Sequence, residues 1–340
     1  MTTPAKQLGG LELDGGWRVI EPIAVSGDHT GGHFSQGYIV ESSGGDQGFL
    51  KALDFTKALQ ADDPARALYA MTQAFNFERD VLLKCRGADR VVRVLADGKV
   101  VVAGQTVQYL IFELANGDVR SQANVSKRFN LAFALRALHH VATGLSQLHS
   151  RDIAHQDLKP SNVLLFDGKV SKVADLGRAG YKGYVTPHEE LEIAGDRTYA
   201  PLELHYHHID PDWNRRRFGC DAYLLGSMVV FFFSGIGMTA FLFTQLHESH
   251  NWHNWGGTYE EVLPYVRDAF DRVMGSFQTD IPGEVRDVIV TTVRELCEPD
   301  PRLRGHPFNR GRAGSQYSLE RYISQFDMLA KRAELGLLGL

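Results

Sequence analysis

The residues with the clearest chemical potential lie in one short stretch near the middle of the chain. Asp157, Lys159 and Asn162 are so close in sequence that one loop must carry a carboxylate, an ammonium group and an amide. Asp175 follows at the end of an expected hairpin that starts directly after Asn162, so the hairpin returns it to the loop. Carboxylate and amide oxygens bind Mg²⁺ together with substrate phosphates. The stretch therefore predicts magnesium-dependent phosphate chemistry.

The spacing of apolar residues and the turn residues around this loop predict the helix and the hairpin that position it. Leu131–His149 has the apolar spacing of a long helix. Val163–Phe166 and Lys169–Val173 are short apolar runs, and the Asp-Gly pair between them is a strong signal for a two-residue hairpin turn. We therefore expect the loop to lie between a helix and a hairpin.

The first third of the chain has the pattern of a sheet with one helix. Short runs separated by glycine and polar residues predict strands at 17–23, 37–41, 48–53, 91–95, 100–103 and 108–113. Residues 63–85 have helical spacing. After a turn at 116–118 the chain is mainly helices and loops, so the pattern indicates an α+β protein with two lobes.

A run without charged residues or histidine extends from Ala222 to Leu246. Its length nominally suffices for a bilayer, but the segment Ser-Gly-Ile-Gly at 234–237 interrupts it. A buried helix to about Phe233 and then a shorter packed segment fit this pattern better. We expect both in the core of a large domain, where helices are apolar on all faces.

Composition excludes several other classes of protein. The chain has 340 residues, of which 44% are hydrophobic and 23% charged, as in globular proteins. Its net charge of −5 gives no bulk attraction to nucleic acid or to an anionic membrane. The three cysteines are far apart, which favours a reducing compartment, and the first residues lack the apolar core of a signal peptide. We expect a cytoplasmic protein with no nucleic-acid and no membrane partner.

The ordered set of motifs resembles the eukaryotic-type protein kinase family. The segment His-Gln-Asp-Leu-Lys-Pro-Ser-Asn at 155–162 is similar to the kinase catalytic loop, and Asp-Leu-Gly at 175–177 to the metal-binding triplet. The resemblance runs from about residue 17 to residue 304. It implies that Asp157 orients the substrate hydroxyl and accepts its proton, that Lys159 neutralises the transferring phosphate, and that Asn162 and Asp175 hold Mg²⁺.

The resemblance also implies a fold and a domain division. The fold would be α+β and bilobal, with a β-rich N-lobe that carries one main helix and a mostly helical C-lobe. The predicted parts are a flexible leader at 1–15, the N-lobe at 16–115, the C-lobe at 116–310 and a C-terminal helical extension at 311–340.

An ATP site is implied by the same resemblance. Lys51, in an expected strand, would grip the phosphates, with Glu78 of the following helix as its ion-pair partner. Further implied nucleotide contacts are Gly32, Gly37 and Ile39 of a glycine-rich stretch, Glu113 and Ala115 of the interlobe hinge, and Leu164. The sequence departs from the family in two ways. The usual G-x-G-x-x-G spacing does not align, and Phe49 stands where a small residue usually faces adenine.

The segment from Asp175 to Glu203 resembles a kinase activation segment, and the resemblance implies that Glu203 pairs with Arg304 as a structural bridge. Asp221 is similar to the aspartate of the central helix that anchors the catalytic loop.

Gln156 replaces the arginine that usually precedes the catalytic aspartate and pairs with a phosphorylated activation segment. We therefore hypothesise that activity does not require phosphorylation of Tyr181, Tyr184, Thr186 or Thr198.

These observations predict a serine/threonine protein kinase that uses ATP and Mg²⁺ and acts on protein substrates, with autophosphorylation as one outcome. Two alternatives remain open. The chain could be a catalytically inactive kinase-like binding module, which the unusual glycine stretch and Phe49 favour. It could also be a small-molecule phosphotransferase of the aminoglycoside-kinase kind, against which Lys159 and the Glu203–Arg304 pair argue.

Overall fold

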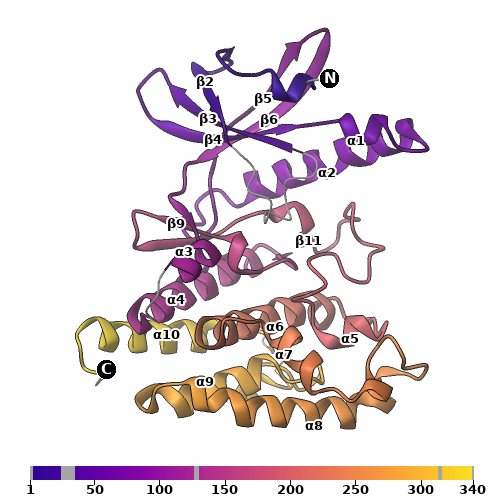
Figure 1. Cartoon of the computed structure of the whole chain (residues 1–340), viewed down its shortest axis with the longest axis vertical. Coiled ribbons are helices and arrows are strands. Elements are labelled where there is room, and N and C mark those ends of the chain that lie inside the picture. The colour runs from indigo at the N-terminus through magenta and orange to yellow at the C-terminus, as the bar shows by residue number, and fades with distance from the viewer. Residues whose placement is uncertain (1–2, 24–34, 126–129, 313–315, 339–340) are drawn as a thin grey trace. The chain divides into compact units, whose positions relative to one another are not determined.

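The computed structural model describes residues 3–23, 35–125, 130–312 and 316–338 (Figure 1). The chain forms two compact units, an N-terminal unit, Met1–Asn116, and a C-terminal unit, Gly117–Leu340. The other boundaries of the four-part division stay predictions.

The N-terminal unit is a sheet with one long helix. Its elements are η1 (Pro4–Lys6), β1 (Glu12–Leu13), β2 (Trp17–Pro22), β3 (Ser35–Ser42), β4 (Gln47–Leu53), α1 (Thr56–Leu59), α2 (Pro64–Lys84), β5 (Val94–Val102) and β6 (Gln105–Glu113). The strands pair antiparallel in the order β1-β2-β3-β4-β6-β5. One face of the sheet forms the core of this unit, with Tyr38, Val40, Leu50, Tyr109 and Ile111 buried on it.

The first residues complete this core, so the prediction of a flexible leader was wrong for residues 3–13. Ala5 and Leu8 are buried in the core cluster together with Leu13. The hydroxyl of Tyr38 donates a hydrogen bond to the carbonyl of Ala5 at 2.7 Å and accepts one from the amide of Leu8 at 3.4 Å. A few apolar residues among glycines suffice to cover the sheet. Because the segment is polar in overall composition, the sequence did not indicate that these residues would be buried.

The strands expected at 91–95 and 100–103 are one strand, β5. Asp97, Gly98 and Lys99 have the composition of a turn, yet they pair with β6 without interruption. Gly98 lies opposite Tyr109, and a Cβ at Gly98 would come within 2.6 Å of the Tyr109 ring. Gly98 therefore makes room for an aromatic side chain and does not mark a turn.

The C-terminal unit is mainly helical. Its elements are β7 (Gly117–Asp118), α3 (Val119–Val125), α4 (Leu131–His149), β8 (Ile153–Ala154), η2 (Pro160–Asn162), β9 (Val163–Phe166), β10 (Val170–Val173), η3 (Leu176–Arg178), β11 (Gly180–Tyr181), α5 (Leu202–His205), α6 (Trp213–Ser234), α7 (Met238–Gln245), η4 (Glu248–His250), α8 (Tyr259–Phe277), η5 (Gln278–Asp280), α9 (Gly283–Leu296), η6 (Pro307–Asn309) and α10 (Glu320–Glu334).

Two long helices, α4 and α6, occupy the core of this unit. Each begins at a capping side chain: Asn130 accepts a hydrogen bond from the amide of Phe133, and Asp212 accepts one from the amide of Arg215. Helix α10 packs along α4, and α9 packs against α6 (Figure 1). These contacts give the loop that follows α4 and carries Asp157 a rigid support.

The apolar run divides as the sequence predicts, into α6 and the shorter α7. Within the described residues, α6 is the helix that is long and apolar enough to cross a membrane by length and composition. Of its most apolar window, 78% is buried inside the structure. The core helix of a large domain has the same character.

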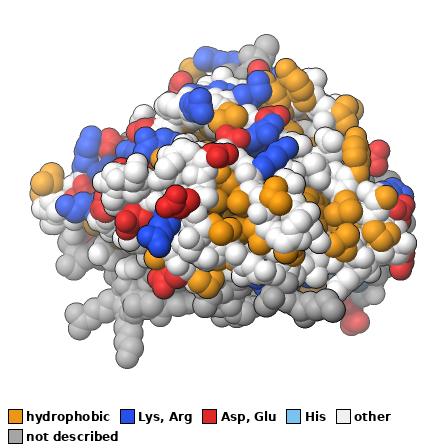
Figure 2. Space-filling model, turned by 90° about the horizontal axis from the view of Figure 1, so that it is seen from above, with side chains coloured by type: hydrophobic (Ala, Val, Ile, Leu, Met, Phe, Trp, Pro, Cys, Tyr) orange, Lys and Arg blue, Asp and Glu red, His pale blue; other side chains and the backbone are white. Residues whose placement is uncertain are grey.

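The surface seen from above in Figure 2 carries charges of both signs. Lysine and arginine side chains lie among aspartates and glutamates, with hydrophobic side chains between them.

Candidate active site

The loop that carries Asp157 is anchored by a buried carboxylate. Asp221 of α6 is 0% exposed, and its two oxygens accept hydrogen bonds from the backbone amides of His155 at 2.8 Å and Gln156 at 2.7 Å. The Nε2 atom of His149 lies 2.9 Å from the same carboxylate. These bonds hold Gln156 at a φ of +65°, a conformation that non-glycine residues seldom adopt without such support. The loop is thereby fixed to the core helix.

Three predicted site residues meet within this loop. The ammonium of Lys159 lies 3.5 Å from a carboxylate oxygen of Asp157. The amide nitrogen of Asn162 donates to the backbone carbonyl of Asp157 at 2.8 Å and to its carboxylate at 3.2 Å. All three residues are buried. Their side chains are therefore held in fixed orientations around Asp157.

The hairpin returns Asp175 to the loop, as predicted. Strands β9 and β10 pair antiparallel, with Val163 opposite Val173. The amide of Ala174 donates to the carbonyl of Asn162 at 2.9 Å, and the carbonyl of Ala174 lies 2.9 Å from Nε2 of His155. Asp175 follows directly, with a left-handed φ of +62°. The structure thus brings Asp175 beside the loop that carries Asp157 and Asn162.

The environment of Asp157 favours its protonated form more than water does. Burial raises the pKa of the Asp157 carboxyl, and the negative charge of Asp175 raises it further. The ammonium of Lys159 and a hydrogen bond from the amide of Asp196 act in the opposite direction without cancelling the rise. A carboxylate with a raised pKa is better able to accept a proton during a reaction.

Asn162 and Asp175 offer the hard oxygen ligands that Mg²⁺ takes in proteins. The amide nitrogen of Asn162 is bonded to Asp157, which fixes the orientation of its side chain. Within the described ranges, no group of three or more His, Cys, Asp or Glu side chains is placed to hold a metal ion. One carboxylate and one amide fit a magnesium ion that shares its coordination with substrate phosphates.

Asp196 is a site residue that sequence reasoning missed. Its backbone amide donates to the Asp157 carboxylate at 2.7 Å, and its own carboxylate lies 3.3 Å from the ammonium of Lys159. Lys159 therefore bridges two carboxylates from segments far apart in sequence. No local pattern indicates this contact, because it depends on how the chain between Asp175 and Glu203 folds back onto the loop that carries Asp157.

Gly195→Ala should destabilise this junction. A Cβ at Gly195 would lie 2.7 Å from Oδ1 of Asp157 and 2.9 Å from its Cα, which is closer than real Cβ atoms approach. Relief requires the segment to move away from Asp157, and overpacking of this kind costs about 1–3 kcal/mol. We expect a lower melting temperature in thermal denaturation. The matched control is Gly275→Ala in α8, where nothing lies within 4 Å, and an unchanged or raised melting temperature is expected there. If both variants melt like the wild type, the close packing at Gly195 is refuted.

In the N-terminal unit, Lys51 and Glu78 form the predicted ion pair. The ammonium of Lys51, on β4, lies 2.8 and 2.9 Å from the two carboxylate oxygens of Glu78, on α2. The side chain of Lys51 is 25% exposed and that of Glu78 is 7% exposed. The pair therefore fixes the lysine, whose side chain stays partly exposed.

Three further residues of the ATP prediction share one face of the sheet with Lys51. Alternation along the strands places Gly37, Ile39, Phe49 and Lys51 opposite the buried core face. Ile39 is directly across from Phe49, and Gly37 is directly across from Lys51. A Cβ at Gly37 would come within 2.8 Å of the Phe49 ring, so the absence of a side chain at Gly37 makes space for that ring.

The remaining residues predicted to contact ATP lie in different parts of the chain. Glu113 ends β6, where its carboxylate accepts a hydrogen bond from the amide of Arg93 at 2.8 Å, and Ala115 follows in the connecting segment. Leu164 lies in β9 of the C-terminal unit, across from Lys172. Gly32 lies outside the described residues.

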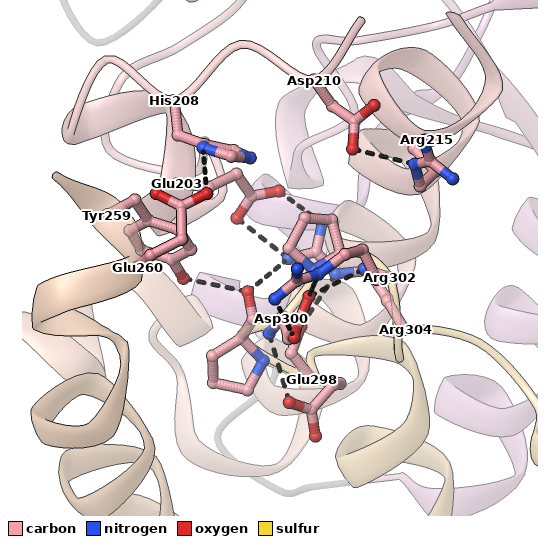
Figure 3. A network of polar contacts seen from close by, with 12 residues as sticks. Glu203, His208, Asp210, Arg215, Tyr259, Glu260, Glu298, Asp300, Arg302 and Arg304 are labelled. Carbon is pink, nitrogen blue, oxygen red and sulfur yellow. Dashed lines mark hydrogen bonds and ion pairs between the residues drawn. The ribbon is translucent and has the colours of Figure 1, made fainter. Parts of the chain in front are cut away.

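A buried ion pair joins distant parts of the C-terminal unit (Figure 3). The guanidinium of Arg304 is bidentate to Glu203, with N–O distances of 2.6 and 2.9 Å. It also donates to the carbonyls of Gly219 at 3.1 Å and Glu298 at 3.0 Å, and the Arg304 side chain is 0% exposed. Around it, the exposed Arg302 binds the buried carboxylate of Asp300. The pair ties the end of the activation segment to the loop after α9.

The fold and these two sets of residues define the class of the protein. A sheet-rich unit with a Lys–Glu ion pair and a helical unit with an anchored acidic loop make up the α+β fold of protein kinases. The family described as "Protein kinase domain" matches residues 47–304, which is more than half of the chain. The chain belongs to the protein kinase family, and the predicted fold class and family are confirmed.

Several curated kinases are similar to this chain over part of their length. An Aurora kinase of Debaryomyces hansenii is 34% identical over 97 residues, which are 28% of this chain and 24% of the relative. MAP kinase-interacting serine/threonine-protein kinase 1 of Xenopus laevis is 30% identical over 170 residues, 46% of this chain and 39% of the relative. CBL-interacting protein kinase 26 of Oryza sativa subsp. japonica is 34% identical over 77 residues, 23% of this chain and 16% of the relative. The chain thus matches well under half the length of each of these relatives.

Proposed function

We propose that this chain is an ATP- and Mg²⁺-dependent kinase that phosphorylates Ser and Thr hydroxyls of protein substrates, itself among them. The observation that carries the proposal is the gathering of Asp157, Lys159, Asn162 and Asp175 around one loop anchored by Asp221. Membership of the protein kinase family supports a protein substrate. Lysine two residues after the aspartate supports the Ser/Thr class.

In the proposed reaction, Asp157 orients the attacking hydroxyl and accepts its proton as the new bond to the γ-phosphorus forms. The bond between this phosphorus and the bridging oxygen breaks, and ADP leaves with the electron pair. Lys159 stabilises the charge on the phosphoryl group in transfer. Bound Mg²⁺ supplies charge neutralisation for the phosphate oxygens, and Asn162 and Asp175 are the residues that would hold it.

The nucleotide part of the proposal rests on the N-terminal unit. Lys51 binds the phosphates and is fixed by Glu78, while Gly37 and Ile39 face the nucleotide from the sheet. Glu113 and Ala115, together with Leu164 and Gly32, complete the proposed contacts.

A transfer assay tests this proposal. The full chain is incubated with radiolabelled ATP and Mg²⁺, alone and with generic protein substrates, and phosphorylated residues are identified by mass spectrometry. Label on serine and threonine supports the proposal. A thermal shift with ATP and Mg²⁺ without transfer would instead support the binding module. Transfer to an aminoglycoside but not to protein would support the small-molecule phosphotransferase.

Phe49 is the observation that favours the binding module, and in an active kinase its replacement tests whether the ring obstructs ATP binding. The ring lies on the same face as Lys51 and Ile39, where the family usually has a small residue that faces adenine. We expect Phe49→Ala to lower the KM for ATP by about threefold or more, because removing the ring enlarges the space for the base. Val101→Ala, at a 70% exposed residue of β5, is the control and should leave KM unchanged. A higher KM in Phe49→Ala would mean that the ring belongs to the binding surface.

We also propose a cytoplasmic protein with no nucleic-acid or membrane partner. All three cysteines are free and buried, which supports a reducing compartment. Cell fractionation with quantitative detection of the chain tests the location.

A further inference from the structure

The side chain of Gln156 is bonded at both ends. Its amide nitrogen donates to the carbonyl of Arg178 at 3.1 Å. Its amide oxygen accepts a hydrogen bond from Nη1 of Arg217 on α6. Gly180 packs against the side-chain amide of Gln156, since a Cβ at position 180 would come within 2.8 Å of the amide nitrogen. Gln156 therefore joins the catalytic loop to the activation segment and to the core helix.

Arg217 extends this connection to a carboxylate. Its residue exposure is 2%, and its Nη2 atom donates to Oε1 of Glu189 in the activation segment at 3.0 Å. A buried arginine needs a partner of opposite charge, because an unpaired buried charge is strongly unfavourable. The same guanidinium thus contacts both the residue before Asp157 and the activation segment.

Glu189 is held as an anion by several groups. Nη1 of Arg216 lies 3.6 Å from its Oε1, and Nη2 of Arg216 donates to its backbone carbonyl at 2.9 Å. The hydroxyl of Thr186 donates to its Oε2 at 3.2 Å. Burial alone would raise the pKa of Glu189, but the hydrogen bond to Arg217 and the charges of both arginines outweigh burial and lower it. Glu189 is therefore ionised near neutral pH.

We propose that Glu189 is a built-in anion that holds the activation segment in place without phosphorylation, and that Glu189 and Arg217 are positioning residues that act on Asp157 through Gln156. This inference rests on the proposed kinase function. A phosphate on an activation segment acts by pairing with arginine, and here a genetically encoded carboxylate makes that pair. An arginine at 156 would face Arg217 at hydrogen-bonding distance, whereas glutamine offers an acceptor to Arg217 and a donor to Arg178.

The structure also changes how the role of phosphorylation should be tested. The hydroxyl of Thr186 binds Glu189, and that of Thr198 donates to Asp196 at 2.7 Å. Replacing these threonines would remove structural hydrogen bonds as well as phosphorylation sites. Phosphatase treatment of the full chain is therefore a better experiment than replacing these threonines. Mass spectrometry of the intact protein verifies that phosphate has been removed.

The test compares phosphatase-treated wild type with Glu189→Gln, Glu189→Asp and the matched control Glu190→Gln, the exposed neighbouring acid. We expect the treated wild type and Glu190→Gln to keep activity within twofold of the untreated wild type. Glu189→Gln should lower kcat by about tenfold, with KM for ATP within twofold, and should also lower the melting temperature, because Arg217 then stays buried without its partner. Glu189→Asp should recover part of the loss, because it restores the charge. Activity is measured well below the melting temperature of every variant, where a purely structural role would leave kcat of the folded Glu189→Gln protein at the wild-type value.

Hydrogen exchange of peptides covering 178–192 gives a second measurement that needs no catalysis. Glu189→Gln should lose protection there, while Glu190→Gln should not. If the wild type is active and Glu189→Gln matches it, or if phosphatase treatment abolishes activity, the inference is overturned and the proposed function stands. If the wild type transfers no phosphate, the proposed function fails, and the exchange result alone decides whether Glu189 holds the segment.

Discussion

Asp157→Asn should lower the rate of phosphate transfer at least a hundredfold with little change in stability. Asparagine has the same shape and can still accept the hydrogen bond from the amide of Asp196, which the structure places 2.7 Å from the Asp157 carboxylate. It loses only the longer bond of 3.2 Å from the amide nitrogen of Asn162, because an amide NH2 group replaces the second oxygen. It cannot accept a proton, and it carries no negative charge beside the ammonium of Lys159. General acid–base groups typically contribute about 10²–10⁴-fold to a rate, so the loss should fall in that range.

Initial rates with radiolabelled ATP and a melting curve for each protein provide the measurement. Asp287→Asn, at an exposed residue of α9, is the matched control and should retain the wild-type rate. More than a tenth of the wild-type rate in Asp157→Asn would exclude Asp157 as the proton acceptor. The alternative of a binding module predicts no rate to lose, so the wild-type measurement separates that outcome from a misassigned residue.

Arg304→Met should produce the largest loss of stability among single substitutions in the Glu203–Arg304 network of Figure 3. It leaves the carboxylate of Glu203, whose side chain is 7% exposed, without its bidentate partner. Removing one member of a buried ion pair costs about 3–5 kcal/mol. At about 2–4 °C per kcal/mol for a domain of 150–250 residues, the melting temperature should fall by roughly 6–20 °C.

Two controls make this second prediction specific. The double variant Glu203→Gln with Arg304→Met should be more stable than Arg304→Met alone, because no unpaired charge remains buried. Arg302→Met removes a 60% exposed arginine that binds the buried Asp300 in the same loop. Asp300 keeps the guanidinium of Arg267 at 3.5 Å and the backbone amide of residue 302 at 3.0 Å as partners, so we expect a smaller loss of stability than in Arg304→Met. If Arg302→Met and Arg304→Met destabilise the chain equally, the loss does not come from the buried pair.

Local patterns in the sequence were sufficient for the centre of the site. Asp157, Lys159 and Asn162 share one loop, and the Asp-Gly turn of the β9–β10 hairpin determines where Asp175 returns. The break in the apolar run at 234–237 likewise separates α6 from α7. In each case the interacting residues are close in sequence, so hydrophobic periodicity and turn type determine the outcome.

Contacts between residues far apart in sequence could be predicted only from the family resemblance or found only in the structure. The pairing of Glu203 with Arg304 was predicted from the family resemblance, since nothing near either residue in the sequence indicates it. The contacts of Asp196 with Lys159 and of Glu189 with Arg217 were not predicted at all. Both depend on the path of the activation segment, which is an irregular loop without a hydrophobic period. Gln156 was recognised as unusual, but its partner on α6 could be found only in three dimensions.

The packing of the first residues against Tyr38 has a practical consequence for protein production. A truncated version that starts at residue 16, where a sequence-based boundary falls, would delete Ala5, Leu8 and Leu13. Tyr38, which is 1% exposed, would lose both backbone partners of its hydroxyl, and apolar side chains of the sheet would meet water. Such a version is expected to aggregate on expression, so work on the isolated kinase domain should retain this N-terminal cover.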